Sequence, residues 1–159
     1  MVRIWFNHWF SAVYNIIEMM REGCKEDLYV IGSNRNAAAV YKSSCNEWYT
    51  EPDKLSEDEY VDFCLDFCNE HEVDVFVPRR ELTGASMPIN IQLRMHEGRM
   101  LLLEINPRMS GGMQLSCAAS GINVPAIALN QLIGYETIWQ YPAYESKKVA
   151  HVERAICFD

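Results

Sequence analysis

The residues best suited to chemistry lie in a short stretch where polar and apolar side chains alternate. Glu104 and Asn106 are two residues apart on a predicted strand, so their side chains should leave the same face. Gln92 lies on the neighbouring predicted strand and can reach the same region. One carboxylate with amide oxygens is the all-oxygen ligand set that Mg²⁺ prefers. The sequence therefore predicts a metal site formed by Gln92, Glu104 and Asn106.

A candidate phosphate-binding segment follows directly. Arg108 can offer two parallel N–H donors to a phosphate group. Gly111 and Gly112 precede a predicted helix over 113–120, and the first N–H groups of a helix can bind an anion. A metal site and a phosphate site side by side would suit a Mg–nucleotide complex. The alternative is a half-buried hairpin with a solvated polar face, and the pattern by itself leaves both interpretations open.

A β-hairpin must position these side chains. Residues 89–95 and 100–105 are predicted strands. A three-residue loop, His96 to Gly98, with Gly98 in the left-handed conformation, places positions 92, 104 and 106 on one face. That register gathers apolar residues on the opposite face, which we expect to pack on the helices from Met113 to Ile133. A two-residue loop would instead pair position 92 with 103 and mix the faces.

Residues 1–78 alternate predicted strands and helices, which is typical of a parallel, Rossmann-like sheet. Ser56 and Glu59 form a capping box before one helical pattern. Asn7 and His8 follow the first strand, where α/β sheets bind ligands, although ordinary polar loop residues are the simpler interpretation. The remaining expected elements are strands at 2–6, 28–31, 48–49, 73–77 and 147–158, and helices over 13–20, 34–41, 60–67 and 123–134.

Composition restricts the classes of function. The chain has 159 residues, 49% of them hydrophobic, and a net charge of -8, which argues against nucleic acid as a partner. No apolar run is long enough for a membrane helix. Cys64 and Cys68 could share a metal but lack a second pair at zinc-site spacing, so small core residues are the simpler interpretation. We expect reduced cysteines and a cytoplasmic protein.

The hairpin residues resemble a known family. Asn90-Ile91-Gln92, then Leu102 to Arg108, then Gly111-Gly112, are similar to the C-terminal part of ATP-grasp enzymes, most of all the branch that resembles carbamoyl-phosphate synthetase. Residues 119–125 also look like that branch, and residues 1–78 resemble the Rossmann-like domain that precedes an ATP-grasp domain. The resemblance implies an α/β protein with a Rossmann-like parallel sheet at 1–80. The C-terminal ATP-grasp portion, with the antiparallel hairpin and helices, would occupy 81–159.

The resemblance also implies a reaction. Such enzymes use ATP and Mg²⁺, with Mn²⁺ as an alternative, to convert a carboxylate into an acyl phosphate, which an amine then attacks. The family's metal ligands correspond to Gln92, Glu104 and Asn106, and its phosphate-contacting catalytic arginine corresponds to Arg108. Small carboxylates and amines are therefore the expected substrates.

The chain departs from the family pattern in one respect. The segment that clamps ATP, with its lysines and glycine-rich lid, should lie between the sheet and the hairpin, where this chain has only residues 79–88. The chain also has no lysine between Lys54 and Lys147. We expect the chain by itself to be inactive, and a non-catalytic Mg–nucleotide-binding or interaction module is the alternative function. Loss of the neighbouring segment would leave an open strand edge on the hairpin, which predicts a homodimer.

Overall fold

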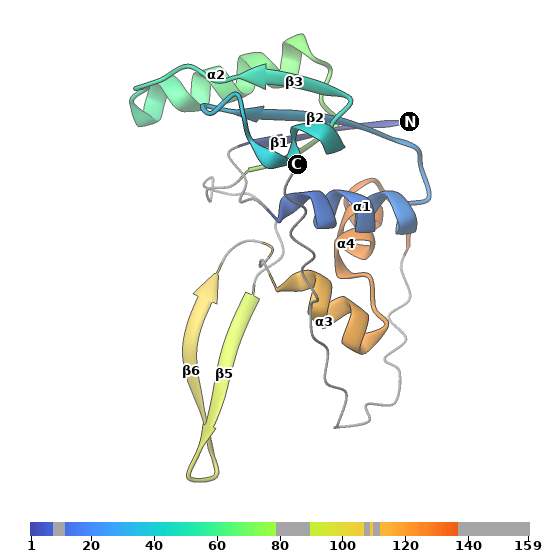
Figure 1. The fold of residues 1–159 in the computed structure, drawn as a ribbon, viewed down its shortest axis with the longest axis vertical. Helices are drawn as coiled ribbons and strands as arrows, with labels where there is room; N and C mark the ends of the chain where they lie inside the picture. The colour runs from blue at the N-terminus through green and yellow to red at the C-terminus, as the bar shows by residue number, and fades with distance from the viewer. Residues whose placement is uncertain (8–11, 79–89, 107–108, 110–111, 137–159) are drawn as a thin grey trace, which may run out of the picture.

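The structure, a computed structural model, describes residues 1–7, 12–78, 90–106, 109 and 112–136. For residues 90–93 and 104–106 it describes the backbone. The described chain forms a layered α/β body from which a hairpin extends (Figure 1). The expected strand at 147–158 lies outside the described residues.

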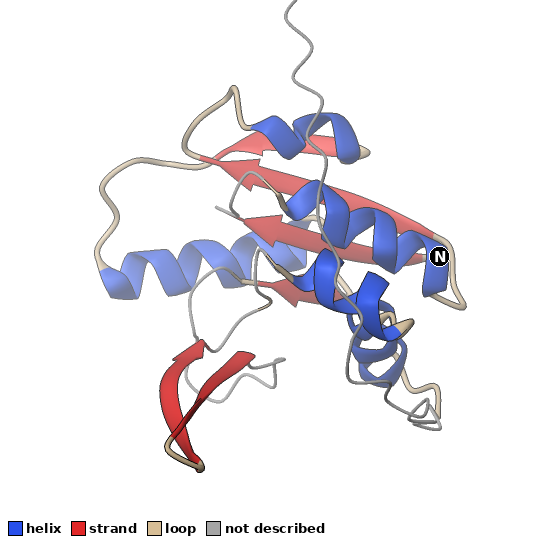
Figure 2. Ribbon diagram, turned by 60° about the horizontal axis from the view of Figure 1, so that its bottom comes forward, coloured by secondary structure: helices blue, strands red, loops and turns tan. Residues whose placement is uncertain are grey.

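Four parallel strands form the sheet in the order β3-β2-β1-β4 (Figure 2). The strands are β1 (Val2–Asn7), β2 (Leu28–Asn34), β3 (Glu47–Thr50) and β4 (Val75–Val77). Each lies at a predicted strand, and the parallel Rossmann-like arrangement is confirmed. The chain passes from β3 across to β4 on the far side of β1, so the first strand in sequence lies in the interior of the sheet.

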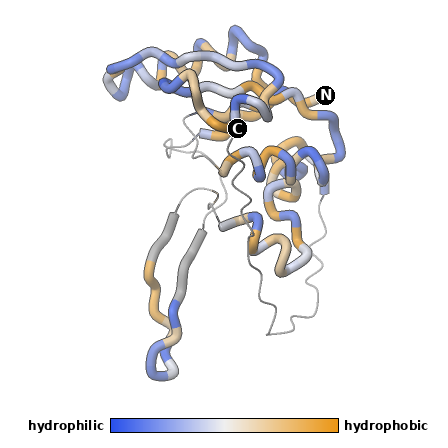
Figure 3. Tube along the Cα trace, viewed as in Figure 1, coloured by the Kyte–Doolittle hydropathy of each residue, from blue (hydrophilic) through white to orange (hydrophobic). Residues whose placement is uncertain are grey.

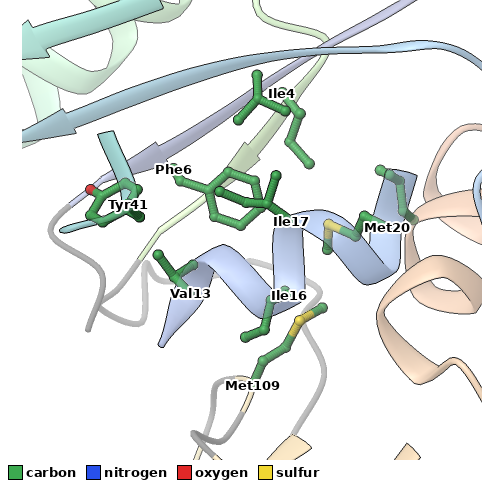
Figure 4. Close-up of a cluster of buried hydrophobic side chains, with 10 residues drawn as sticks. Ile4, Phe6, Val13, Ile16, Ile17, Met20, Tyr41 and Met109 are labelled. Atoms are coloured by element: carbon green, nitrogen blue, oxygen red, sulfur yellow. The ribbon is translucent and has the colours of Figure 1, made fainter. Parts of the chain in front are cut away.

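Side chains of β1 alternate between two apolar layers. Ile4 and Phe6 pack with the buried face of α1 (Val13–Gly23), as Figure 4 shows. Trp5 points to the other face, where it packs with Phe67 of α2 (Glu57–Glu70). Both faces of the sheet are therefore covered, as burial of a continuous apolar strand requires.

Local sequence signals explain where the helices begin. At α2, the Ser56 hydroxyl accepts from the backbone N–H of Glu59 at 3.3 Å, and the Glu59 carboxylate accepts from the Ser56 N–H at 2.8 Å, so the predicted capping box is confirmed. At α4 (Val124–Leu132), Asn123 accepts from the N–H of Ala126 at 3.1 Å. α3 (Met113–Ser120) coincides with the predicted helix.

One helix prediction was wrong. The helix expected over 34–41 is instead a short 3-10 helix, η1 (Val40–Ser44). The preceding segment forms side-chain turns, in which Asn34 and Asn36 accept backbone N–H groups two residues further on, at 2.9 and 3.0 Å. Such Asx turns compete with helix formation. The pattern that predicted a helix gave no information about that competition.

Helices α3 and α4 lie beside α1 on one side of the sheet (Figures 1 and 2). The Asn130 amide joins α4 to the end of α1, because it donates to the Gly23 carbonyl at 2.9 Å and accepts from the Lys25 N–H at 3.0 Å. Asn123 donates to the Met19 carbonyl at 2.6 Å. A Cβ atom at Gly23 would lie 2.5 Å from the Cβ of Ala126, so glycine permits this close approach.

The hairpin consists of β5 (Asn90–His96) and β6 (Arg99–Asn106). The predicted three-residue loop was wrong, because His96 pairs with Arg99 and leaves a two-residue turn. Glu97 and Gly98 have φ values of 48° and 74°, the two positive angles of a type I′ turn, whose twist suits a hairpin. The positive φ predicted for Gly98 is confirmed.

The predicted packing of the hairpin was also wrong. Its described apolar side chains are exposed rather than covered by the helices: Met95, Met100, Leu101, Leu102 and Leu103. Figure 3 shows apolar residues along β6 on a hairpin that extends away from the body. The helices pack on α1 instead, because the buried face of α1 and the small residue Gly23 accommodate them closely.

The described helices are short. The longest, α2, has 14 residues, and no helix in the described ranges is long and apolar enough to cross a membrane. Cys24, Cys45, Cys64, Cys68 and Cys117 are free thiols. Burial raises the pKa of the Cys64 thiol to about 11, which agrees with its interpretation as a core residue.

Candidate functional site at the base of the hairpin

The base of the hairpin brings together positions that the sequence singled out. Asn90 lies opposite Asn106, and Gln92 lies opposite Glu104. A bulge between Gln92 and Leu93 restores this pairing, because Leu93 lies opposite Leu102 and Leu103 is the extra residue of β6. Counting from a two-residue turn would pair position 92 with position 103. The bulge shifts the register, so Gln92 lies opposite Glu104 instead.

The bulge divides the hairpin into two halves. Near the body, position 90 pairs with position 106 and position 92 pairs with position 104. These four amide and carboxylate residues therefore share one face of the ladder. Nearer the turn, Arg94 pairs with Leu101 and Met95 pairs with Met100. The polar register needed for a metal site thus belongs to the half of the hairpin next to the body.

Met109 anchors the chain just beyond β6. Its side chain is buried in the apolar cluster of the body and lies beside Ile16 of α1 (Figure 4). Between Asn106 and α3 the chain therefore returns to the core at one defined point. The sequence pattern did not predict this role, because its signal was a single apolar residue within an otherwise polar and glycine-rich segment.

The N-terminus of α3 (Met113) follows β6, which ends at Asn106, after a short connection in the chain. Gly112 occupies its N-cap position and provides no side-chain cap, while its carbonyl accepts from the Ser116 N–H at 3.2 Å. First-turn N–H groups without a side-chain cap are suitable donors for an anion. Arg108 and Gly111 lie outside the described residues, so their predicted phosphate contacts stay predictions.

The described part of the chain contains no group of three or more His, Cys, Asp or Glu residues that could hold a metal ion. That result does not test the predicted metal site, because Gln92, Glu104 and Asn106 contain one carboxylate and two amides. The roles of Gln92, Glu104 and Asn106 as ligands remain predictions supported by strand register.

A second polar group lies at the carboxyl edge of the sheet. Trp5 Nε1 donates to the Ser33 hydroxyl at 2.7 Å, and that hydroxyl donates to Glu51 at 2.6 Å. Asn7 is buried and donates to the Tyr60 hydroxyl. Burial raises the pKa of the Tyr60 phenol. These contacts favour a structural role for Asn7, and His8 lies outside the described residues.

Comparison with known proteins gives one family match, and it covers the hairpin. Residues 63–155, more than half of the 159-residue chain, match the family described as "ATP-grasp in the biosynthetic pathway with Ter operon". The chain belongs to this ATP-grasp family. No curated protein and no solved structure gives a significant match.

The matched region of this ATP-grasp chain begins within α2 and continues through the hairpin, α3 and α4. It crosses the expected domain boundary at residue 80. The contacts of α4 with α1 likewise join residues from both sides of that boundary. The division into 1–80 and 81–159 stays a prediction.

Proposed function

We propose that this ATP-grasp protein binds a Mg–nucleotide complex at the base of the hairpin, with Gln92, Glu104 and Asn106 as metal ligands. The observation that carries the proposal is the register that sets Gln92 opposite Glu104. The set fits Mg²⁺ because it combines one carboxylate with amide oxygens and leaves the remaining coordination positions to phosphate and water. Mn²⁺ suits the same oxygen ligands.

Arg108 and the N-terminal segment of α3, including Gly111 and Gly112, would bind the phosphate groups. The guanidinium can form paired hydrogen bonds with phosphate oxygens, and helix N–H groups favour negative charge. A bound Mg²⁺ would neutralise further phosphate charge. In this arrangement Met109 positions the segment, because its buried side chain holds the chain between β6 and α3.

The proposed reaction is ATP-dependent ligation of a carboxylate to an amine. A carboxylate oxygen attacks the γ-phosphorus of ATP and ADP leaves, which forms an acyl phosphate. The amine nitrogen then attacks the acyl carbon, phosphate leaves, and the nitrogen loses a proton. We expect this chain by itself to bind nucleotide weakly and to show no turnover, because it has no lysine between Lys54 and Lys147 to contact the phosphates.

The alternative function is a non-catalytic module that binds Mg–nucleotide or another protein. The exposed apolar residues of the hairpin favour an interaction role, because scattered exposure is ordinary but a contiguous apolar patch marks a contact surface. ADP release that depends on a carboxylate would identify a ligase. Nucleotide binding without turnover would identify a binding module.

Titration calorimetry with Mg-ATP tests the proposed site. We expect weak binding by the wild-type chain and its loss in Glu104→Gln, which removes the carboxylate charge. Glu97→Gln is the matched control, because Glu97 is an exposed carboxylate at the hairpin turn. Equal binding by wild type and Glu104→Gln would contradict the assignment, and a low-micromolar dissociation constant would contradict the expected weakness.

A further inference from the structure

The outer face of α2 carries one sign of charge. Asp58, Asp62 and Asp66 follow at intervals of four residues, which places them in one row along the helix. All three are exposed, and none forms an ion pair with any residue in the described ranges. Val61 and Leu65 lie beside this row with 44% and 58% of their surfaces exposed. The result is an acidic surface with an apolar strip, here called the α2 face.

The distal half of the hairpin carries the complementary features. Arg94 pairs with Leu101 and His96 pairs with Arg99, so these four residues share one face of the ladder. All four are exposed, and within the described ranges neither arginine forms an ion pair. We call this surface the hairpin face. It offers two guanidinium groups on either side of an apolar residue.

We propose that the hairpin face docks on the α2 face of a second copy of this chain. Neighbouring aspartates in the row are about 6 Å apart along the helix axis. Arg94 and Arg99 are diagonal neighbours across the ladder, about 7 Å apart. Two arginines can therefore pair with two successive aspartates. Leu101 would then lie against Val61 and Leu65, which removes apolar surface from water.

We infer a second copy as the partner because every chain carries both complementary surfaces and holds them far apart. The hairpin and α2 lie at opposite ends of the long axis of the molecule in Figure 1, and no contact between them is among the main contacts of the fold. Each chain presents both surfaces, so a twofold axis would form the contact twice. Two copies of a modest contact bind more tightly than one, because the second forms within an assembled pair.

Charge reversal on each surface provides the first test. Sedimentation of the full chain at micromolar concentrations should show a dimer that weakens as NaCl is added, because exposed ion pairs are screened. Arg94→Glu with Arg99→Glu should raise the dimer dissociation constant at least about tenfold. Asp62→Lys with Asp66→Lys should have the same effect. Circular dichroism confirms that each variant folds.

Mixing the two reversed variants provides the decisive test. Each should be monomeric alone, whereas an equimolar mixture should restore a dimer, because every hairpin face again meets an α2 face of opposite charge. Arg35→Glu with Lys42→Glu is the matched control, since both side chains are exposed and the charge change equals that of the arginine variant. This control should dimerise like the wild type.

Three results would overturn the proposal. A wild-type chain that stays monomeric through the micromolar range would show that the two faces do not associate. A dimer that survives both reversals would assign the contact to the other face of the hairpin, where Met95, Met100 and Leu102 are exposed. Failure of the mixed variants to associate, with both parents monomeric, would show that the two surfaces do not meet each other.

Discussion

The sheet body and the hairpin use apolar residues in opposite ways. In the body, Ile4, Trp5 and Phe6 are fully buried in succession, because helices cover both faces of the sheet. In the hairpin, successive leucines from Leu101 to Leu103 are exposed. Burial therefore determines the register of the body, whereas the turn and the bulge determine the register of the hairpin. The body should hold most of the folding stability.

The largest expected effect is loss of the central aromatic residue of the body. Trp5 stacks between Phe67 and Phe76, with ring centroids 4.2 and 4.1 Å away, and donates a hydrogen bond to Ser33. Trp5→Ala should lower the free energy of unfolding by about 3–5 kcal/mol, because it leaves a cavity between two rings. Urea denaturation followed by circular dichroism measures the change.

The matched substitution in the hairpin is Leu102→Ala. Leu102 is 57% exposed, so its replacement should change the free energy of unfolding by less than about 0.5 kcal/mol. A loss comparable to that of Trp5→Ala would mean that Leu102 is covered in solution by another part of this chain or by a second copy. Measurement across a range of protein concentrations separates these two explanations.

An effect smaller than that of Trp5→Ala but larger than that of Leu102→Ala should reveal whether α4 belongs to the body. Asn130 is buried and connects α4 to Gly23 and Lys25 through two hydrogen bonds. Asn130→Ala should lower the free energy of unfolding by about 2 kcal/mol, because it removes two partly buried hydrogen bonds that each contribute about 1 kcal/mol. Gln131→Ala is the exposed control. Unchanged stability in Asn130→Ala would support a separate unit after residue 80.

The smallest effect on global unfolding should come from the turn of the hairpin. Gly98 has a φ of 74°, a conformation that costs a side-chain-bearing residue about 1 kcal/mol. Gly98→Ala should therefore speed hydrogen exchange of the β5 and β6 amides while leaving the unfolding of the body unchanged. A lower free energy of unfolding of the body, or faster exchange throughout it, would show that the hairpin and the sheet unfold together.

Local patterns predicted much of the secondary structure. The capping box at Ser56 and Glu59 and the cap at Asn123 depend on residues three apart, so they can be recognised without tertiary information. The candidate metal ligands were likewise identified from spacing and residue type. Their shared register at the base of the hairpin was expected for the wrong reason, because a bulge and not a longer turn produces it.

The sequence by itself determined the alternation of strands and helices, the helix caps and the ATP-grasp signature from Gln92 to Arg108, because each depends on neighbouring residues. Only the tertiary structure decided the strand order, the packing of α4 on Gly23 and the burial of Met109. These features depend on which apolar surfaces meet among segments far apart in the chain, and several pairings bury similar areas. Close packing selects one of them, and local propensity carries no information about that choice.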